Sequence, residues 1–217
     1  MILVAGGIKG GSGKTTLACN LTVMRARSGR DVLLVDADDQ QSAAEFTELR
    51  TEEKGDPGYT CIRLDGKAVR DQVRRLADKY DDVMIDTGGR DTTSQRAALT
   101  VADALIVPFG PRSLDIWTLE RVEELVEDAR AVNPDLSAYC FINRADHQGS
   151  YNQETRDVLT DSDAVEFVNA PLGNRKSFAI AFDYGQSVVE YKPRDKKAIR
   201  EINQLFETVF DIVSTPE

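Results

Sequence analysis

The chain is short of the residues on which several classes of protein depend. It contains three cysteines and one histidine in 217 residues. Cys19, Cys61 and Cys140 lie far apart in apolar patterns, and no paired-cysteine spacing accompanies His147. We therefore expect core cysteines in a cytosolic protein, without a zinc or disulfide site. No apolar run approaches the roughly 18 residues of a membrane span, and a strand-like N-terminus fits neither a signal peptide nor a transit peptide.

Positive charge is also scarce. The chain has 27 Lys and Arg against 37 Asp and Glu, which gives a formal net charge of −10. This balance argues against broad attraction to nucleic acid but allows a local basic patch. The hydrophobic content of 41% and the charged content of 29% are typical of a globular protein. With no internal repeat or low-complexity linker, we expect one domain over residues 1–217.

A glycine-rich turn stands close to the start of the chain. The apolar residues 2–5 predict a buried strand, and the spacing of apolar residues after Lys14 predicts a helix. A strand, such a turn and a helix form a phosphate-binding loop, because backbone N–H groups and the helix N-terminus converge on the phosphates. We expect Lys14 to reach the β- and γ-phosphates and the Thr15 hydroxyl to bind Mg²⁺. The expected phosphate-binding residues are Gly10, Gly11, Ser12, Gly13, Lys14, Thr15 and Thr16.

Strand-like and helix-like segments alternate through most of the chain. This alternation predicts an α/β fold, a three-layer α/β/α sandwich with a mostly parallel central sheet. Ligands of such sheets bind at the carboxyl ends of the strands. Expected strands cover residues 32–35, 61–64, 83–86, 104–108, 138–142 and 165–168, and expected helices begin near residues 14, 43, 69, 97, 114 and 151, with a terminal helix at the end.

Three aspartates follow predicted strands. Asp86 comes directly after the apolar residues 83–85 and is the natural Walker B carboxylate for Mg²⁺. Asp36 and Asp38 end the strand before it. A carboxylate at this place either serves the metal site or caps the next helix, and for Asp36 both alternatives stay open.

The usual phosphate-loop pattern, G-x-x-x-x-G-K-[ST], fails at its first glycine, which falls on Ile8, and a second lysine, Lys9, follows. This deviant Walker A motif resembles that of the ParA/MinD group of P-loop ATPases. The resemblance implies that ATP builds a homodimer in which Lys9 reaches the partner's phosphates, while Lys14 and Asp38 act in hydrolysis. Asp39 stands where the group has a proline, which leaves the hydrolysis geometry open.

The same resemblance extends to later segments. It implies that the Asn143 amide reads the adenine edge, beside Arg144, and that Pro171 begins the other wall of the base pocket; tight-turn use of Asn143 is the alternative. Residues 87–89 resemble a switch, and residues 108–115 resemble a loop at the dimer interface. Arg90 and Asp91 belong either to the switch or to a surface ion pair.

Within this group, ParA-type proteins bind DNA nonspecifically with a ParB-like adaptor, whereas MinD-type proteins insert a basic C-terminal helix into membranes. Here the C-terminal helix carries Glu201, Glu207 and Asp211, so no membrane partner is expected. Residues 192–200 hold five basic residues against one acid. They suit DNA phosphates, although a solvated helix start is the alternative, and Arg70, Arg74, Arg75 and Lys79 fit a solvated helix face.

We therefore expect a cytoplasmic, nucleoid-associated ATPase that uses ATP and Mg²⁺ to position a plasmid, a chromosome or a protein assembly. A MinD-like positioning ATPase and a biosynthetic P-loop enzyme of the dethiobiotin synthetase type are the alternatives.

Overall fold

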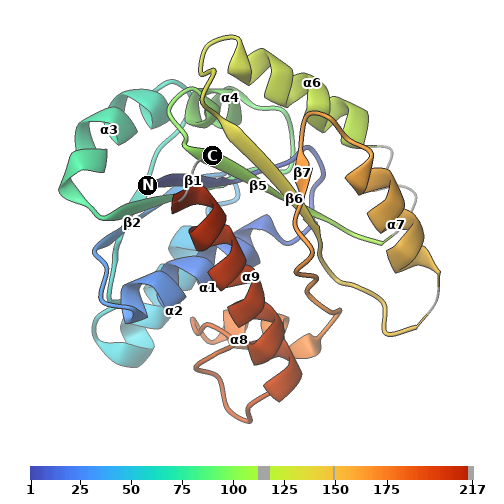
Figure 1. Ribbon diagram of the computed structural model, residues 1–217. Coiled ribbons are helices and arrows are strands. Elements are labelled where there is room, and N and C mark those ends of the chain that lie inside the picture. Colours follow the sequence, from blue (N-terminus) through green and yellow to red (C-terminus); the bar gives the residue numbers. More distant parts are fainter. Residues whose placement is uncertain (112–117, 149, 215–217) are drawn as a thin grey trace.

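The computed structural model describes residues 1–111, 118–148 and 150–214. Seven strands form one sheet in the order β3-β2-β4-β1-β5-β6-β7, with helices on both faces (Figure 1). All the neighbouring strands run parallel. The predicted three-layer α/β/α sandwich is therefore confirmed. In chain order the strands are β1 Ile2–Ala5, β2 Val32–Ala37, β3 Thr60–Arg63, β4 Asp82–Thr87, β5 Ala104–Phe109, β6 Ser137–Ile142 and β7 Glu166–Phe167.

Two hydrophobic cores cover the two faces of the sheet. Successive side chains of a strand point to opposite faces, so Leu3 enters one core and Val4 the other. Complete burial of such aliphatic side chains stabilises the fold by about 1.5–3 kcal/mol each. The first core is covered by α1 Lys14–Arg27, α2 Ser42–Lys54, α8 Lys176–Asp183 and α9 Lys196–Ser214. The second is covered by α3 Ala68–Leu76, α4 Thr93–Leu99, α6 Leu119–Arg130 and α7 Tyr151–Thr160.

The register of the three central strands sets the position of the site. Asp86 near the end of β4 is the partner of Ala5 on β1 and of Asp36 on β2. The turn that follows β1 therefore starts beside both carboxylates. This is the carboxyl edge of the parallel sheet, where the ligand was expected.

Some boundaries differ from the sequence expectations. The helix expected from residue 114 to 132 is described as α6 over Leu119–Arg130, and residues 114–117 lie outside the described part of the chain. The spacing up to Tyr80 predicted one helix, but α3 ends at Leu76 and a 3₁₀ turn follows over Ala77–Lys79. Helix α8 was not predicted.

The C-terminal helix packs on the sheet. Its residues Ala198, Ile202, Leu205 and Val209 are completely buried in the first core. The Asp195 carboxylate caps the helix by accepting hydrogen bonds from the N–H groups of residues 197 and 198, at 3.0 and 3.1 Å. Within the described ranges, we find no helix with the length and apolar character needed to span a bilayer.

Candidate active site

The glycine-rich turn leads from β1 into α1. Gly11 and Gly13 have φ of 74° and 95°, in the left-handed region that favours glycine. A Cβ on Gly13 would also lie only 2.4 Å from Nδ2 of Asn143. The turn therefore needs glycine at residue 13 for both its backbone and its packing.

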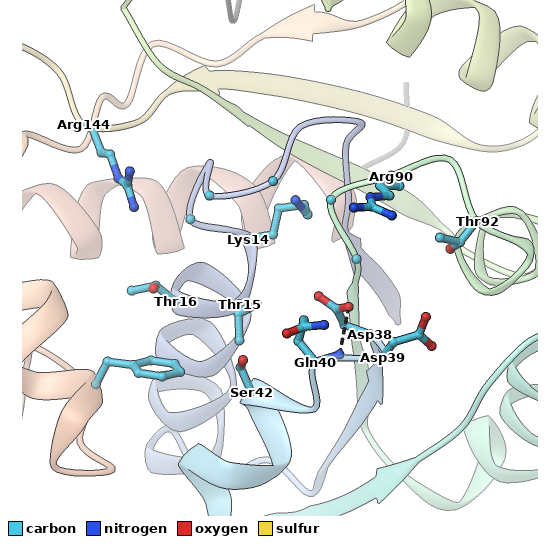
Figure 2. A pocket seen from close by; sticks show the side chains of 16 residues that line it. Lys14, Thr15, Thr16, Asp38, Asp39, Gln40, Ser42, Arg90, Thr92 and Arg144 are labelled. Atoms are coloured by element: carbon cyan, nitrogen blue, oxygen red, sulfur yellow. Dashed lines mark hydrogen bonds between the residues drawn. The ribbon is translucent and has the colours of Figure 1, made fainter.

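A cavity of about 800 Å³ opens beside this turn (Figure 2). Three segments form most of its lining: the turn with the first residues of α1, the loop after β2, and the loop after β4. Arg144 and Phe182 complete it. Its size and its position at the N-terminus of α1 fit a nucleoside triphosphate, because the helix dipole and the free N–H groups there attract phosphate. The lining side chains labelled in Figure 2 are Lys14, Thr15, Thr16, Asp38, Asp39, Gln40, Ser42, Arg90, Thr92 and Arg144.

Lys14 is held in place by the turn itself. Its Nζ donates a 2.8 Å hydrogen bond to the main-chain carbonyl of Lys9, and the residue is only 5% exposed. Burial lowers the pKa of Lys14, although the nearby charges of Asp86 and Asp38 oppose that shift. The two lysines of the deviant motif are thus joined through the backbone of the first.

Asp86 is completely buried. Neither carboxylate oxygen makes a hydrogen bond of good geometry to any residue in the described ranges. Burial raises the pKa of Asp86 to about 8, an effect that the neighbouring Thr15 hydroxyl and Lys14 oppose. A buried carboxylate beside a threonine hydroxyl offers the oxygen ligands that Mg²⁺ prefers. The residues Asp86 and Thr15 therefore fit the magnesium ion expected with a nucleotide.

Asp36 and Asp38 differ in burial and in the groups that their carboxylates bind. The buried Asp36 carboxylate accepts hydrogen bonds from the N–H groups of Asp38 and Ala44, at 3.1 and 2.8 Å. One oxygen thus binds the turn after β2 and the other binds the first turn of α2. These are the contacts expected if Asp36 caps the helix. Its role as a metal ligand stays a prediction. Asp38 lines the cavity, and its carboxylate accepts a 3.2 Å hydrogen bond from the Gln40 N–H.

The switch glycines touch both of the other loops. A Cβ on Gly89 would lie 2.4 Å from Cα of Gly10, and a Cβ on Gly88 would lie 3.1 Å from the Asp38 carboxylate. Glycine is needed at residue 89 because its backbone lies directly against the phosphate-binding turn, whereas Gly88 lies against the loop after β2.

Gln95 was missed by the sequence reasoning. It is completely buried on α4, and its Oε1 accepts hydrogen bonds from the N–H of Gly7 and the hydroxyl of Thr87, at 3.0 and 2.8 Å. The same hydroxyl lies 3.2 Å from the Ala5 carbonyl. Gln95 thus joins the start of the turn to the end of β4. A polar residue within a helix gives no such signal in the sequence.

Asn143 contacts the turn and also lines a second cavity. Its Nδ2 donates a 2.7 Å hydrogen bond to the Ser12 carbonyl, and its Oδ1 accepts one of 3.0 Å from the Arg144 N–H. These contacts support the structural alternative, and adenine recognition by this amide stays a prediction. This second cavity, of about 250 Å³, is also lined by Arg144, by residues 172–175 of the expected base wall and by Lys176. Pro171 is not among the described residues that line it.

Lys9 lines a third cavity, of about 380 Å³, on the outer side of the turn. Gly110, Pro111 and Asp146 line the same cavity. Of the loop expected at a dimer interface, residues 112–115 lie outside the described part of the chain. Lys9 does not line the nucleotide cavity of its own chain, as far as the described residues show.

Helix α8, in the last third of the chain, contributes to the wall of the site. Phe182 on this helix lines the nucleotide cavity and packs on Phe46 with ring centroids 5.0 Å apart. The segment after α8 is fixed by Glu190, whose carboxylate binds three cations: Arg50 and Lys54 at 2.7 Å and Arg27 at 3.0 Å. Hydrogen bonds from Arg50 and Lys54 outweigh the effect of burial and hold the pKa of Glu190 at about 2.

The fold and this site define a P-loop nucleotide-binding protein. A model of the "CobQ/CobB/MinD/ParA nucleotide binding domain" matches residues 2–188. The chain belongs to this family, and it is an ATPase of the ParA/MinD type.

Individual relatives agree with this assignment. The maintenance of carboxysome distribution protein A of Halothiobacillus neapolitanus is 26% identical over 208 residues, covering 95% of both chains. An ATP complex of an aspartate-to-alanine McdA variant from Cyanothece has a TM-score of 0.76 at 18% identity, covering 100% of this chain and 97% of that one. A plasmid partition protein from Borrelia burgdorferi has a TM-score of 0.74 at 19% identity, covering 97% of each chain.

Proposed function

We propose that this protein is a positioning ATPase of the ParA type. In this proposal ATP and Mg²⁺ build a homodimer that binds DNA nonspecifically, and a ParB-like adaptor connects the dimer to its cargo and stimulates hydrolysis. The names of the relatives, a carboxysome distribution protein and a plasmid partition protein, support a distributed or segregated cargo. Lys14, Thr15 and Asp86 would bind the phosphates and the metal ion, and Asp38 would orient the attacking water.

The observation that carries the dimer is the position of Lys9. Its carbonyl accepts the hydrogen bond of Lys14, but its side chain lines the cavity on the outer side of the turn. Among the described residues, Lys9 is not part of the lining of its own chain's nucleotide cavity. A second protomer facing this side would bring its phosphates within reach of Lys9.

Packing of α9 weighs against the membrane-binding alternative. The apolar face that a membrane helix would insert is already buried in the first core, at Ile202, Leu205 and Val209. After Arg200 the helix carries Glu201, Glu207 and Asp211 and no Lys or Arg, and anionic lipids repel such a face.

A Lys9→Ala substitution tests the dimer. We expect the wild-type chain to form a dimer with ATP and Mg²⁺ in size-exclusion chromatography, and the variant to remain a monomer that still binds nucleotide through Lys14. Lys79→Ala is the matched control, since Lys79 is exposed and lies before the opposite end of β4. A Lys9→Ala chain that still forms the ATP-dependent dimer contradicts the proposal.

A further inference from the structure

We propose that Arg90 is a further catalytic residue of this ATPase and that it contacts the terminal phosphate of the ATP bound by its own chain. Arg90 follows the two switch glycines and lines the nucleotide cavity. Figure 2 shows its guanidinium group turned toward the phosphate-binding turn and Lys14. The inference depends on its contacts, its backbone and its place along the cavity.

Arg90 and its neighbour Asp91 have different contacts. The Asp91 carboxylate is bound by two nitrogens of Arg96, each at 2.7 Å, and Arg96 also binds Asp128 at 2.9 Å. Asp91 is therefore committed to an ion pair on the protein surface. Arg90 forms no hydrogen bond or ion pair with any described residue. Its planar fork of five N–H donors is available to a ligand.

The backbone on both sides of Arg90 is fixed. Gly89 lies directly against Gly10, as the 2.4 Å approach of an added Cβ to Gly10 Cα shows. On the other side, the Thr92 hydroxyl accepts a 3.1 Å hydrogen bond from the Gln95 N–H and caps α4. Arg90 is thus held at the rim of the cavity, one residue from the contact with the turn.

Three cationic side chains lie along the cavity in a definite order. Arg144 also lines the base-side cavity, so it marks the end where the base and sugar would lie. Lys14 lies between Arg144 and Arg90 in Figure 2. Because the lysine of a phosphate-binding loop reaches the β- and γ-phosphates, the terminal phosphate lies on the Arg90 side. Asp38 and Asp39 line that side too, and an arginine there offsets their repulsion of the phosphate.

During hydrolysis, the contact with Arg90 would stabilise negative charge on the phosphoryl group. The oxygen of the attacking water bonds to the γ-phosphorus while the bond to the bridging oxygen breaks, and the electron pair leaves with ADP. The water proton passes to the released phosphate. Arg90 neither gives nor takes a proton in this step. Its charge stabilises the phosphoryl oxygens as the transition state develops, as cationic clamps do in phosphoryl transfer.

The test compares nucleotides that differ in the γ-phosphate. With the full chain and Mg²⁺, Arg90→Ala is expected to weaken AMPPNP binding about 10- to 100-fold, the size of effect typical of charge-assisted hydrogen bonds. ADP affinity is expected to change less than about twofold, because ADP lacks the group that Arg90 contacts. Isothermal titration calorimetry measures both affinities. Arg90→Lys keeps the charge without the fork and is expected to fall between the two.

Arg121→Ala is the matched control. Arg121 is exposed on α6 and lines the neighbouring groove together with Arg90, but it does not line the described wall of the nucleotide cavity. We expect its affinities to equal those of the wild type. Equal losses of AMPPNP and ADP affinity in Arg90→Ala, or no loss for either, overturn the proposal.

A second variant tests whether the contact is made within one chain. In a Lys9→Ala chain, which we expect to remain monomeric, adding Arg90→Ala should still produce the selective loss of AMPPNP affinity. If the loss disappears in that background, Arg90 acts on the partner's nucleotide and the assignment is overturned. Because this readout is binding by a monomer, it stands or falls independently of the dimer and of DNA binding.

Discussion

The environment of Asp86 raises its pKa far above that of an isolated aspartate side chain. The residue is completely buried, its oxygens make no well-formed hydrogen bond within the described ranges, and its pKa is raised to about 8. Without a metal ion, the folded protein must hold either a proton or an unpaired charge at this position. Either state costs stability at neutral pH, since the unfolded chain leaves the carboxylate in water.

This cost predicts a pH dependence that one substitution removes. Because the folded pKa lies above the unfolded value, the folded protein binds more protons between about pH 4 and pH 8, and its stability falls as the pH rises. The contribution of Asp86 is up to about 1.4 kcal/mol per pH unit in this window. Asp86→Asn should make the metal-free protein more stable at pH 8, measured by urea unfolding at several pH values.

The outcome at low pH provides the control for this prediction. Near pH 4 the wild type carries a neutral Asp86, so the variant and the wild type should differ little. With ATP and Mg²⁺ the order should reverse, because only the wild type retains the carboxylate for the metal ion. An Asp86→Asn chain whose stability follows the wild-type pH profile contradicts this account.

The residues that the sequence singled out do lie together, although not all in the expected manner. Lys14, Thr15 and Asp38 line one cavity, since the glycine pattern and the strand ends determine their places. Asp36 and Asn143 hold backbone groups instead, Asn143 reaching across 131 positions to Ser12. Such contacts depend on the tertiary arrangement, which local spacing does not encode. Gln95 was missed for the same reason.

At the scale of elements, the central strands were predictable because they are short continuous apolar runs, and α6 and α9 because their apolar residues recur at helical spacing. Helix α8 was not, because its sequence, Lys-Ser-Phe-Ala-Ile-Ala-Phe-Asp, is short and has five apolar residues in succession, a pattern that does not distinguish a helix from a strand. Its function as a wall of the site depends on distant anchors. The Gly185 backbone lies so close to α2 that a Cβ would approach the Arg50 nitrogen to 2.4 Å, and Asn20 on α1 binds Ser187 and Val188 at 2.8 and 2.9 Å.

Glu190→Gln tests how far this segment depends on its ion pairs. The substitution removes the charge that faces Arg27, Arg50 and Lys54, of which Arg50 is buried. Removing one partner of a buried ion pair costs about 3–5 kcal/mol, so the free energy of unfolding should fall by that order at pH 7. Because the folded pKa of Glu190 is lowered to about 2, the wild type should lose this stabilisation as the pH falls from about 4.5 to 2.

Glu207→Gln on α9 makes the same chemical change at a residue outside this cluster and serves as the control. Its stability should stay within about 0.5 kcal/mol of the wild type, the usual range for surface substitutions. If Glu190→Gln is equally mild, the cluster does not anchor the segment and α8 must be held by its packing alone.

At the scale of the whole molecule, the charge distribution is the feature that bears on the proposed DNA binding. The chain carries −10, yet residues 192–200 hold five basic residues and one acid. Lys192, Arg194, Lys196 and Lys197 are exposed just before α9 and on its first two residues, and they form no ion pair within the described part of the chain. A cationic segment on an acidic protein localises any attraction to phosphate at one place on each protomer.

Neutralising these four side chains with glutamine should therefore weaken DNA binding of the ATP-bound protein strongly while leaving nucleotide binding intact. The slope of log affinity against log salt should fall by about 3 to 4 if all four contact phosphates. Arg70, Arg74, Arg75 and Lys79 allow a control with the same change of net charge, on and just after α3. Gel-shift titrations at several salt concentrations measure both variants. Equal losses in the two variants mean that overall charge, not this segment, governs the interaction, whereas retained binding in the first variant excludes residues 192–197 as the DNA contact.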